Sequence, residues 1–510
     1  MPSLVVLSLL PLFLFSPSSH AVTIRIARPQ SSRGGRANVR LHSPHNVDGS
    51  NLINKNNERY TANITMSGRV VNVALDTGST DLWVKPPEGL PTFNNTGLNA
   101  TLRYGDGTDF VTGDIGVGEF KLGSYTVPLQ AFLNVKIAAP AEDADFADGI
   151  FGLMGLGFNT PGSSGINDAV QQAFGPTQNW GQSVLQNIFD QTPNGDNFIG
   201  IALSRTGDQE ETADASLAIS EYHSSHTAVA QAPKLPQNPV GSGAWTVTLD
   251  GLSINGKKIN WPSTMRQAPA GKNIVHLDTG TTNIMMPKQQ VTQIYSAIPG
   301  AVLSPNSYIP MTKFSTSFDV WVVPCNATPS VVASFGGQDF AIHPLDVSDM
   351  EIVTTPDGTT NYTVCVGTFT DVGGIVEGSS DALFGDSFLR NVYSVFDFGT
   401  GGGKNETAFV QLLSLTDPAK SPQDLVNVRM QAMKNMPPEI PAIDLVRIFN
   451  GTLKPYGGAP STGRSGSGGG SGGSGGGSGG SGGRSSSGAV ILTSSLSLLI
   501  LSTLPLLAFW

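Results

Sequence analysis

Two copies of the tripeptide Asp-Thr-Gly are the part of this sequence best suited to catalysis. Asp76 opens the first copy and Asp278 opens the second, and an apolar segment precedes each of them. If the fold brings the two carboxyl groups together, both cannot ionise at close range, so they share one proton. One carboxylate can then take a proton from water while the other carboxyl donates a proton to a carbonyl oxygen. The repeat therefore predicts hydrolysis of an amide bond by a water molecule held between Asp76 and Asp278.

The residues that follow each aspartate are suited to holding the pair in place. The glycine after each Asp-Thr lets the backbone turn tightly. The hydroxyl groups of Thr77 and Thr279 can fix the two loops against each other and so preorganise the carboxyls. The residues expected to support the active site are Thr77, Gly78, Ser79, Thr279, Gly280 and Thr281.

The segments that must position these loops are expected to be β-strands. Short apolar runs such as residues 71–75 and 392–396 alternate with Gly, Asn, Asp and Pro, which is typical of strands joined by turns. An apolar-apolar-Gly segment follows each Asp-Thr-Gly in the same order, ending at Gly152 and at Gly385. This internal echo predicts that the body of the chain is a duplicated β structure.

The duplication predicts a mostly β fold with an N-terminal β lobe over residues 58–235 and a C-terminal β lobe over residues 236–415. Residues 416–460 are expected to form a C-terminal extension with a short helix that packs on the body. Ser421 is suited to the N-cap of this helix and Pro422 to its first position. The apolar face of the helix would consist of Leu425, Val428, Ala432 and Met436.

Several segments resemble the pepsin-like family of aspartic endopeptidases. The run from Asp76 to Val84 (DTGSTDLWV) is similar to the family's first active-site strand with its buried tryptophan. Tyr104-Gly105-Asp106-Gly107 resembles the tip of the family's flap, a hairpin that closes over substrate, and an Asp-Gly pair is independently a hairpin signal. The resemblance covers essentially all of residues 58–415 and extends to the layout of fungal GPI-anchored surface aspartic proteases. It implies a bilobal fold with pseudo-twofold-related lobes and the active site in the cleft between them.

The resemblance also implies what the protein binds. Substrates would be extended polypeptides, and pepstatin-type inhibitors would occupy the same cleft. The expected substrate-binding residues are Tyr104, Gly105, Asp106 and Ile150, with Trp83 as a candidate hydrogen-bond partner of Tyr104. Cys325 and Cys365 fall where the family's C-terminal lobe carries a disulfide. We expect a monomer without a cofactor. No metal is expected either, because no histidine lies in a zinc-binding pattern.

The chain departs from the family pattern at three places. Residues 85–88 (KPPE) replace a loop that is usually bounded by cysteines, and the flap is longer because residues 108–111 are inserted before Thr112. His276 stands two residues before Asp278, where the family usually has an aliphatic residue. Alternation along a strand places His276 and Asp278 on the same face. We interpret His276 as a core histidine whose hydrogen bonds are satisfied.

The composition argues against a nucleic-acid-binding protein. The 510 residues carry a formal net charge of −10 and only 13% of them are charged, whereas nucleic-acid binders present clustered Lys and Arg. Residues 22–57 are the exception, with the arginines Arg25, Arg28, Arg33, Arg36 and Arg40. This basic leader is interpreted either as a propeptide that covers an acidic cleft, as in a zymogen, or as a solvated arm.

The two ends of the chain are typical of targeting segments. Residues 1–21 contain an apolar run and end in Ser19-His20-Ala21, which predicts a signal peptide cut near Ala21. Residues 461–488 are rich in Gly and Ser and are typical of a flexible tether. Residues 489–510 carry no charge and are typical of a GPI-attachment signal, with a membrane-spanning tail anchor as the alternative. We expect a glycoprotein of the secretory pathway, lipid-anchored at the plasma membrane or cell wall.

Seven sequons support this route and are candidate glycosylation sites. Their asparagines are Asn63, Asn94, Asn99, Asn326, Asn361, Asn405 and Asn450. Two alternatives to the endopeptidase remain open from the sequence. The first is a catalytically silent, protease-like protein that binds peptides, although silent members of the family typically lose one of the aspartates. The second is a two-carboxylate glycosidase.

Overall fold

The computed structural model describes residues 24–26, 59–205, 215–305, 309, 319–373, 376, 378–401 and 404–456. The chain divides into two compact units, residues 1–461 and 462–510, and everything described belongs to the first unit. The predicted signal peptide, tether and GPI-attachment segment therefore lie outside the described residues, as does the leader apart from residues 24–26. In the part of the chain that is described, no helix has the length and apolar character needed to cross a membrane.

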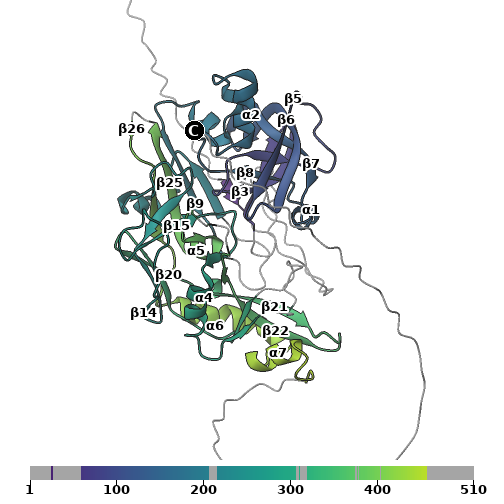
Figure 1. The fold of residues 1–510 in the computed structure, drawn as a ribbon, viewed down its shortest axis with the longest axis vertical. Coiled ribbons are helices and arrows are strands. Elements are labelled where there is room, and N and C mark those ends of the chain that lie inside the picture. Colours follow the sequence, from purple (N-terminus) through teal and green to yellow (C-terminus); the bar gives the residue numbers. More distant parts are fainter. Residues whose placement is uncertain are drawn as a thin grey trace, which may run out of the picture. The chain divides into compact units, whose positions relative to one another are not determined.

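The first Asp-Thr-Gly loop extends from a seven-stranded sheet in the N-terminal half (Figure 1). The strands, in spatial order, are β2 (Thr61–Met66), β3 (Arg69–Asp76), β8 (Gly152–Gly155), β4 (Leu82–Val84), β7 (Tyr125–Ala138), β6 (Asp109–Leu122) and β5 (Asn94–Tyr104). β3 pairs in parallel with β8 and ends at Asp76. The final six residues of β3 are all buried, as expected for a parallel strand that is covered on both faces.

The second loop extends from a five-stranded sheet in the C-terminal half. Its strands, in spatial order, are β12 (Thr246–Leu249), β15 (Asn273–Leu277), β24 (Ala382–Phe384), β16 (Ile284–Met286) and β23 (Phe369–Asp371). β15 pairs in parallel with β24, and β16 pairs antiparallel with β24. The strands β3, β8 and β4 make the same two pairings in the first half. The duplication inferred from the sequence is therefore present in the strand topology.

A further sheet combines strands from both halves of the body. Its strands, in spatial order, are β1 (Ile24–Ile26), β10 (Ala215–Ile219), β9 (Asp196–Ala202), β25 (Val392–Gly401), β27 (Phe409–Ser414) and β11 (Leu235–Pro236), with β26 (Lys404–Asn405) beside β25. β9 of the first half pairs with β25 of the second half (Figure 1). The largest hydrophobic cluster accordingly includes buried residues of both halves, so that the two active-site loops are supported by one continuous core.

Two four-stranded sheets complete the C-terminal half. One has the order β14 (Lys257–Lys258), β13 (Gly251–Ile254), β19 (Val331–Phe335) and β20 (Gln338–Ile342); the other has the order β17 (Val302–Ser304), β18 (Val320–Val323), β22 (Asn361–Gly367) and β21 (Ser348–Thr354). The disulfide expected from the family resemblance is present between Cys325 and Cys365. Its sequence separation of 40 residues corresponds to a stabilisation of about 4 kcal/mol if the bond acts by restricting the unfolded chain.

The helices of the described residues are short. They are α1 (Glu142–Ala147), α2 (Gly165–Phe174), α3 (Val184–Phe189), α4 (Lys288–Tyr295), α5 (Asp386–Leu389), α6 (Ser421–Ala432) and α7 (Ala442–Phe449). Single 3₁₀ turns occupy Asn179–Gly181, Thr227–Gln231, Pro344–Asp346 and Met433–Asn435. α1 and α2 belong to the half that carries the flap, and α2 contacts β5.

The helix predicted after the body is present as α6, but its details differ from the prediction. Ser421 is the first helical residue rather than the N-cap. The buried residues include Leu425 and Ala432 as predicted, whereas Val428 is only partly buried and the helix ends before Met436. Arg429 is fully buried because its guanidinium donates hydrogen bonds to the Oγ and the carbonyl oxygen of Ser348 at 2.7 and 2.8 Å. The buried face of α6 thus includes a hydrogen-bonded arginine, whereas the periodic pattern predicted only apolar residues on that face.

Candidate active site

Asp76 and Asp278 are brought together at the ends of equivalent strands. Asp76 is the last residue of β3, and Asp278 directly follows the last residue of β15. The side chains are buried, with residue exposures of 6% and 8%. The missing Cβ of Gly280 would lie 2.3 Å from Oδ1 of Asp76, and that of Gly78 would lie 2.6 Å from Oδ1 of Asp278. Each carboxyl group therefore packs against the glycine of the opposite loop.

The same donors hold each carboxyl group in its own loop. The Gly78 N–H and the Ser79 hydroxyl donate to the two oxygens of Asp76 at 2.8 and 2.5 Å. The Gly280 N–H and the Thr281 hydroxyl donate to the two oxygens of Asp278 at the same distances. The two halves of the site consequently present their carboxyl groups in matching orientations, as the sequence repeat predicts.

The two threonines join the loops by reciprocal hydrogen bonds. The backbone N–H of Thr77 donates to the Thr279 hydroxyl and the N–H of Thr279 donates to the Thr77 hydroxyl, both at 3.0 Å. Each hydroxyl donates in turn to a carbonyl oxygen of the opposite strand, that of Leu277 at 3.1 Å and that of Leu75 at 2.9 Å. The preorganising arrangement expected of these threonines is thus present in the structure.

Replacing Thr77 with valine is expected to destabilise the protein by about 1–3 kcal/mol, because it leaves the buried Thr279 N–H and Leu277 carbonyl unpaired. Loss of the same contacts should lower kcat, since the two loops are no longer fixed against each other. Urea unfolding and steady-state kinetics would measure the two effects. Thr292→Val is the control, because the Thr292 hydroxyl donates to a carbonyl oxygen within α4 at the exposed surface. Wild-type stability in the Thr77 variant would contradict the role given to these hydrogen bonds.

Burial and mutual repulsion control ionisation at the pair. The pKa of Asp76 is raised to about 7, first because burial disfavours the charged form and second because the Asp278 carboxyl lies beside it. The hydrogen bonds from Ser79 and Gly78 act in the opposite direction. One carboxyl of the pair is therefore able to keep its proton throughout the acidic range.

Asp76→Asn is expected to stabilise the protein at neutral pH. The pKa of Asp76 is about 7 in the folded state against an ordinary value of 3.8, so the folded chain binds more protons than the unfolded chain between these values. Stability is therefore lost as pH rises through this range, by an amount on the order of 1–4 kcal/mol for a single buried group. Melting temperatures should show a gain for the variant over wild type at pH 8 and none at pH 4. The same difference in melting temperature at both pH values would contradict the raised pKa.

The predicted flap is the hairpin formed by β5 and β6. Tyr104 ends β5 and pairs across the hairpin with Asp109. Gly105 and Gly107 have φ angles of +55° and +86°, which glycine adopts without steric cost. Asp106 accepts hydrogen bonds from the Thr108 N–H and hydroxyl at 2.9 and 2.5 Å. The Asp106 carboxylate thus stabilises the turn itself.

Tyr104 is partly buried against the cluster that contains Trp83. Burial and the carboxyl groups of Asp81 and Asp76 raise the pKa of Tyr104, and the Trp83 indole acts in the opposite direction. The Trp83 Nε1 is buried and makes no hydrogen bond of ordinary geometry to the described residues. The two side chains are therefore neighbours, and the expected interaction of the Trp83 indole with the Tyr104 hydroxyl is present without the geometry of an ordinary hydrogen bond. Ile150 is buried, and its contact with substrate stays a prediction.

His276 differs from the expectation of a satisfied core residue. Its Nε2 is buried without a hydrogen-bond partner among the described residues. Burial lowers the pKa of His276, and the neighbouring Asp278 acts in the opposite direction. Cross-strand pairing places it beside Thr246 on β12 and Leu383 on β24. The imidazole is thus a polar group near Asp278 that the family pattern does not include.

Arg59 is a neighbour of the site that no sequence motif indicated. Its Nη1 donates to the Gly280 carbonyl oxygen at 2.7 Å, and its Nε donates to Oδ2 of Asp145 in α1 at 3.2 Å. The side chain keeps 36% of its surface exposed. A residue at the start of the described body therefore contacts the active-site loop of the other half.

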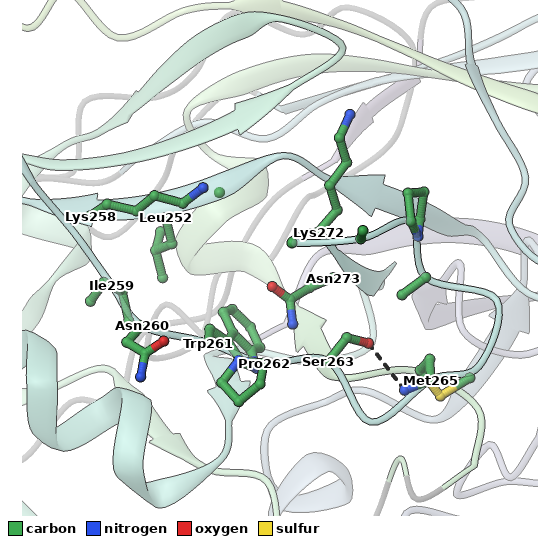
Figure 2. Close-up of a pocket in the computed structure, with 15 residues that line it drawn as sticks. Leu252, Lys258, Ile259, Asn260, Trp261, Pro262, Ser263, Met265, Lys272 and Asn273 are labelled. Atoms are coloured by element: carbon green, nitrogen blue, oxygen red, sulfur yellow. Dashed lines mark hydrogen bonds between the residues drawn. The ribbon is translucent and has the colours of Figure 1, made fainter.

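A cavity of about 670 Å³ lies away from these residues, on the C-terminal half (Figure 2). Asn273 lies between Lys272 and Trp261 in this view, and all three line the cavity together with Lys258. The Lys272 ammonium pairs with Oδ1 of Asp250 at 2.7 Å. None of the predicted catalytic or flap residues lines the cavity, so it is separate from the candidate active site.

The predicted glycosylation sites are mostly accessible. The exposed sequon asparagines are Asn94, Asn99, Asn326, Asn361 and Asn450. Asn63 is partly buried and accepts a hydrogen bond from the Asn72 amide at 3.2 Å. The side chain of Asn405 lies outside the described part of the structure. Attachment of carbohydrate stays a prediction at all seven positions.

Comparison with known proteins identifies the family. The chain matches the eukaryotic aspartyl protease family over residues 59–402. It is 29% identical over 383 residues to an aspartic protease of Phaffia rhodozyma, which covers 71% of this chain and 80% of that protein. It is 27% identical over 355 residues to the aspartic-type endopeptidase ctsD of Aspergillus fumigatus, which covers 66% of this chain and 63% of that protein.

A solved structure supports the fold. The crystal structure of the aspartic proteinase from Irpex lacteus aligns with a TM-score of 0.51 and 17% identity, covering 79% of this chain and 99% of that one. The matched region contains both Asp-Thr-Gly loops, the predicted flap and the strands that position them. This chain therefore belongs to the eukaryotic aspartyl protease family and is an aspartic endopeptidase with the mostly β, bilobal fold of the pepsin-like enzymes.

Proposed function

We propose that Asp76 and Asp278 catalyse hydrolysis of peptide bonds in extended polypeptides at acidic pH. The observation that carries the proposal is the reciprocal packing of the two loops, in which each carboxyl lies against the glycine that follows the other aspartate. One carboxylate takes a proton from water as the water attacks the peptide carbonyl carbon, and the other carboxyl protonates the carbonyl oxygen. The tetrahedral intermediate then breaks its carbon–nitrogen bond as the carboxyl that took the proton from water passes it to the leaving nitrogen. The other carboxylate takes its proton back from the hydroxyl as the carbonyl re-forms.

The surrounding residues would restrict the motion of this pair and cover the substrate. Ser79 and Thr281 hold the outer carboxyl oxygens, and the threonines join the loops. Tyr104, Gly105 and Asp106 would close over a bound polypeptide as the hairpin moves. Pepstatin-type inhibitors would occupy the same cleft of a monomeric enzyme.

The proposed acidic range follows from the Asp76 pKa of about 7. Below that value the pair retains the shared proton that protonates the carbonyl oxygen. As pH rises through about 7 the proton is lost and hydrolysis should stop. At the lowest pH values the remaining carboxylate is also protonated and can no longer accept a proton from water. The rate of hydrolysis should therefore depend on pH as a bell-shaped curve with its maximum at acidic pH.

We also propose display at the cell surface through a lipid anchor. The proposal rests on the sequence features of residues 1–21, 461–488 and 489–510, which are typical of a signal peptide, a flexible tether and a GPI-attachment signal. Release of the protein from intact cells by a phosphatidylinositol-specific phospholipase would test it. Retention after that treatment would favour the tail-anchor alternative.

The decisive experiment is digestion of an unfolded protein by residues 22–460, which contain every described element. Cleavage should be fastest near pH 4, should be blocked by pepstatin and should be absent near pH 8. Equal rates at acidic and neutral pH would contradict the shared-proton assignment. A folded sample that cleaves nothing, with the leader present or removed, would instead favour the silent peptide-binding protein.

A further inference from the structure

Arg59 connects the second Asp-Thr-Gly loop to helix α1 in the other half of the fold. Its guanidinium donates through Nη1 to the Gly280 carbonyl and through Nε to the Asp145 carboxylate. Gly280 lies in the second Asp-Thr-Gly loop, whereas Asp145 lies in α1 of the first half. Only a planar cation with several fixed donors can serve both acceptors in this way.

The Gly280 residue held by Arg59 is in contact with both carboxyl groups. Its N–H donates to Oδ1 of Asp278 at 2.8 Å. Its Cα faces Asp76 so closely that a Cβ atom would lie 2.3 Å from Oδ1. Arg59 therefore fixes, at the carbonyl end, a residue that determines the spacing between Asp76 and Asp278. A shift of Gly280 would move one carboxyl group relative to the other.

Arg59 also places a positive charge within reach of the pair. Asp145, and Glu142 and Asp76 when they are ionised, favour its charged form and raise its pKa. Electrostatic coupling is mutual, so the guanidinium favours the ionised form of Asp76 by the same interaction.

The other charged groups in this region come from three segments. Asp109 is on β6, Glu142 and Asp145 are on α1, and Lys85 follows β4. Burial raises the pKa of Glu142 to about 8, so this carboxyl is neutral in the acidic range. Burial also raises the pKa of Asp109. Asp145 forms the direct ion pair with Arg59. Substitution of Asp145 is therefore the natural counterpart to substitution of Arg59.

We propose that Arg59 is a positioning residue that holds the Gly280 loop against Asp76 and sets the pH range in which the catalytic pair carries one proton. The proposal rests on the proposed function of Asp76 and Asp278. Arg59 has two effects under this proposal. The geometric part is the positioning of Gly280, which depends on the hydrogen bonds of Arg59 to Gly280 and Asp145. The electrostatic part is the effect on ionisation of the two carboxyl groups, which depends only on the charge of the guanidinium.

The test compares the pH profiles of kcat and kcat/KM for the full chain with those of Arg59→Met, Arg59→Lys and Asp145→Asn. The substrate is a peptide with blocked ends and no ionisable side chain. Both the acidic and the basic limb of each pH profile then report ionisation of groups on the enzyme. Arg59→Met removes the charge, which makes the carboxyls harder to ionise, and both limbs should move up by about one pH unit. Its kcat at the optimum should fall about tenfold because Gly280 loses its partner.

The two other variants distinguish charge from geometry. Arg59→Lys keeps the charge but not the fork of donors, so its limbs should stay within a few tenths of the wild-type values while kcat falls. Asp145→Asn keeps Arg59 on Gly280 and removes a negative charge, so its limbs should move to lower pH. Pepstatin titration counts the active sites in each preparation and corrects for misfolded protein.

The outcomes are separable from failure of the proposed function. If the wild-type protein does not cleave the peptide, the function itself is wrong. If the wild type cleaves it and Arg59→Met and Asp145→Asn both give the wild-type profile, the electrostatic part is wrong. If Arg59→Lys and Arg59→Met both keep the wild-type kcat per titrated site, the geometric part is wrong. Limbs that move in the same direction in Arg59→Met and Asp145→Asn would also overturn the proposal.

Discussion

Replacement of Asp76 or Asp278 with asparagine should lower kcat/KM by at least about 10³-fold while the fold is retained. An amide cannot accept the proton of water or deliver one to the carbonyl oxygen, yet it has nearly the size of the carboxyl group. The two residues act as a unit, so the double variant should be no less active than either single variant. Asp417→Asn is the control, because Asp417 is an exposed carboxylate after β27. Retention of more than a tenth of the activity in either single variant would contradict the assignment.

The packing of Asp76 against Asp278 and the hydrogen bonds that support it could be predicted because they depend on local sequence that occurs twice. An Asp-Thr-Gly after a buried strand specifies a turn in which the glycine N–H donates to the aspartate. It also places the threonine where it contacts the equivalent threonine of the other loop. Once two copies share one fold, the reciprocal contacts of Thr77 and Thr279 follow from symmetry. The disulfide was reached differently, because Cys325 and Cys365 are the only cysteines in the chain and family resemblance supplied the pairing.

Arg59 could not be predicted in this way. Its contact with Gly280 spans 221 residues of sequence, and nothing in the neighbourhood of a single arginine indicates which backbone carbonyl it will reach. His276 shows the complementary limit. Alternation predicts that it shares a face with Asp278, but periodicity carries no information on whether its Nε2 finds a partner. Such polar contacts depend on tertiary packing rather than on the pattern of the chain.

The C-terminal extension illustrates the same distinction between pattern and packing. The cap and proline signals located the start of α6 to within one residue. The apolar periodicity did not anticipate Arg429, whose charged end is satisfied by Ser348 in β21. α7 was not predicted at all, although Leu445, Val446 and Phe449 of this helix are buried in one hydrophobic cluster with residues of β18 and β22. Its eight residues are too few for periodicity to separate a helix from a strand with certainty.

Gly280→Ala should lower kcat about 10²-fold while costing much less in stability. Gly280 does not have a positive φ, so alanine is compatible with the backbone, and the effect arises from contact alone. The added methyl group would lie 2.3 Å from Oδ1 and 2.6 Å from Cγ of Asp76, which is well inside van der Waals contact. The carboxyl group must move, and a displacement of about 1 Å at a reacting group can cost this much in rate.

The control for this substitution is Gly195→Ala, in a turn before β9. Its added Cβ would meet the Thr192 carbonyl oxygen at 3.1 Å, a tight contact that involves no active-site residue. Both variants should unfold within about 1–3 kcal/mol of wild type, because each overpacks a single site. Only Gly280→Ala should lose kcat, and its binding of pepstatin should weaken in parallel, since the inhibitor must meet both carboxyl groups. Wild-type kcat in Gly280→Ala would show that the close approach of this glycine to Asp76 does not control the spacing of the pair.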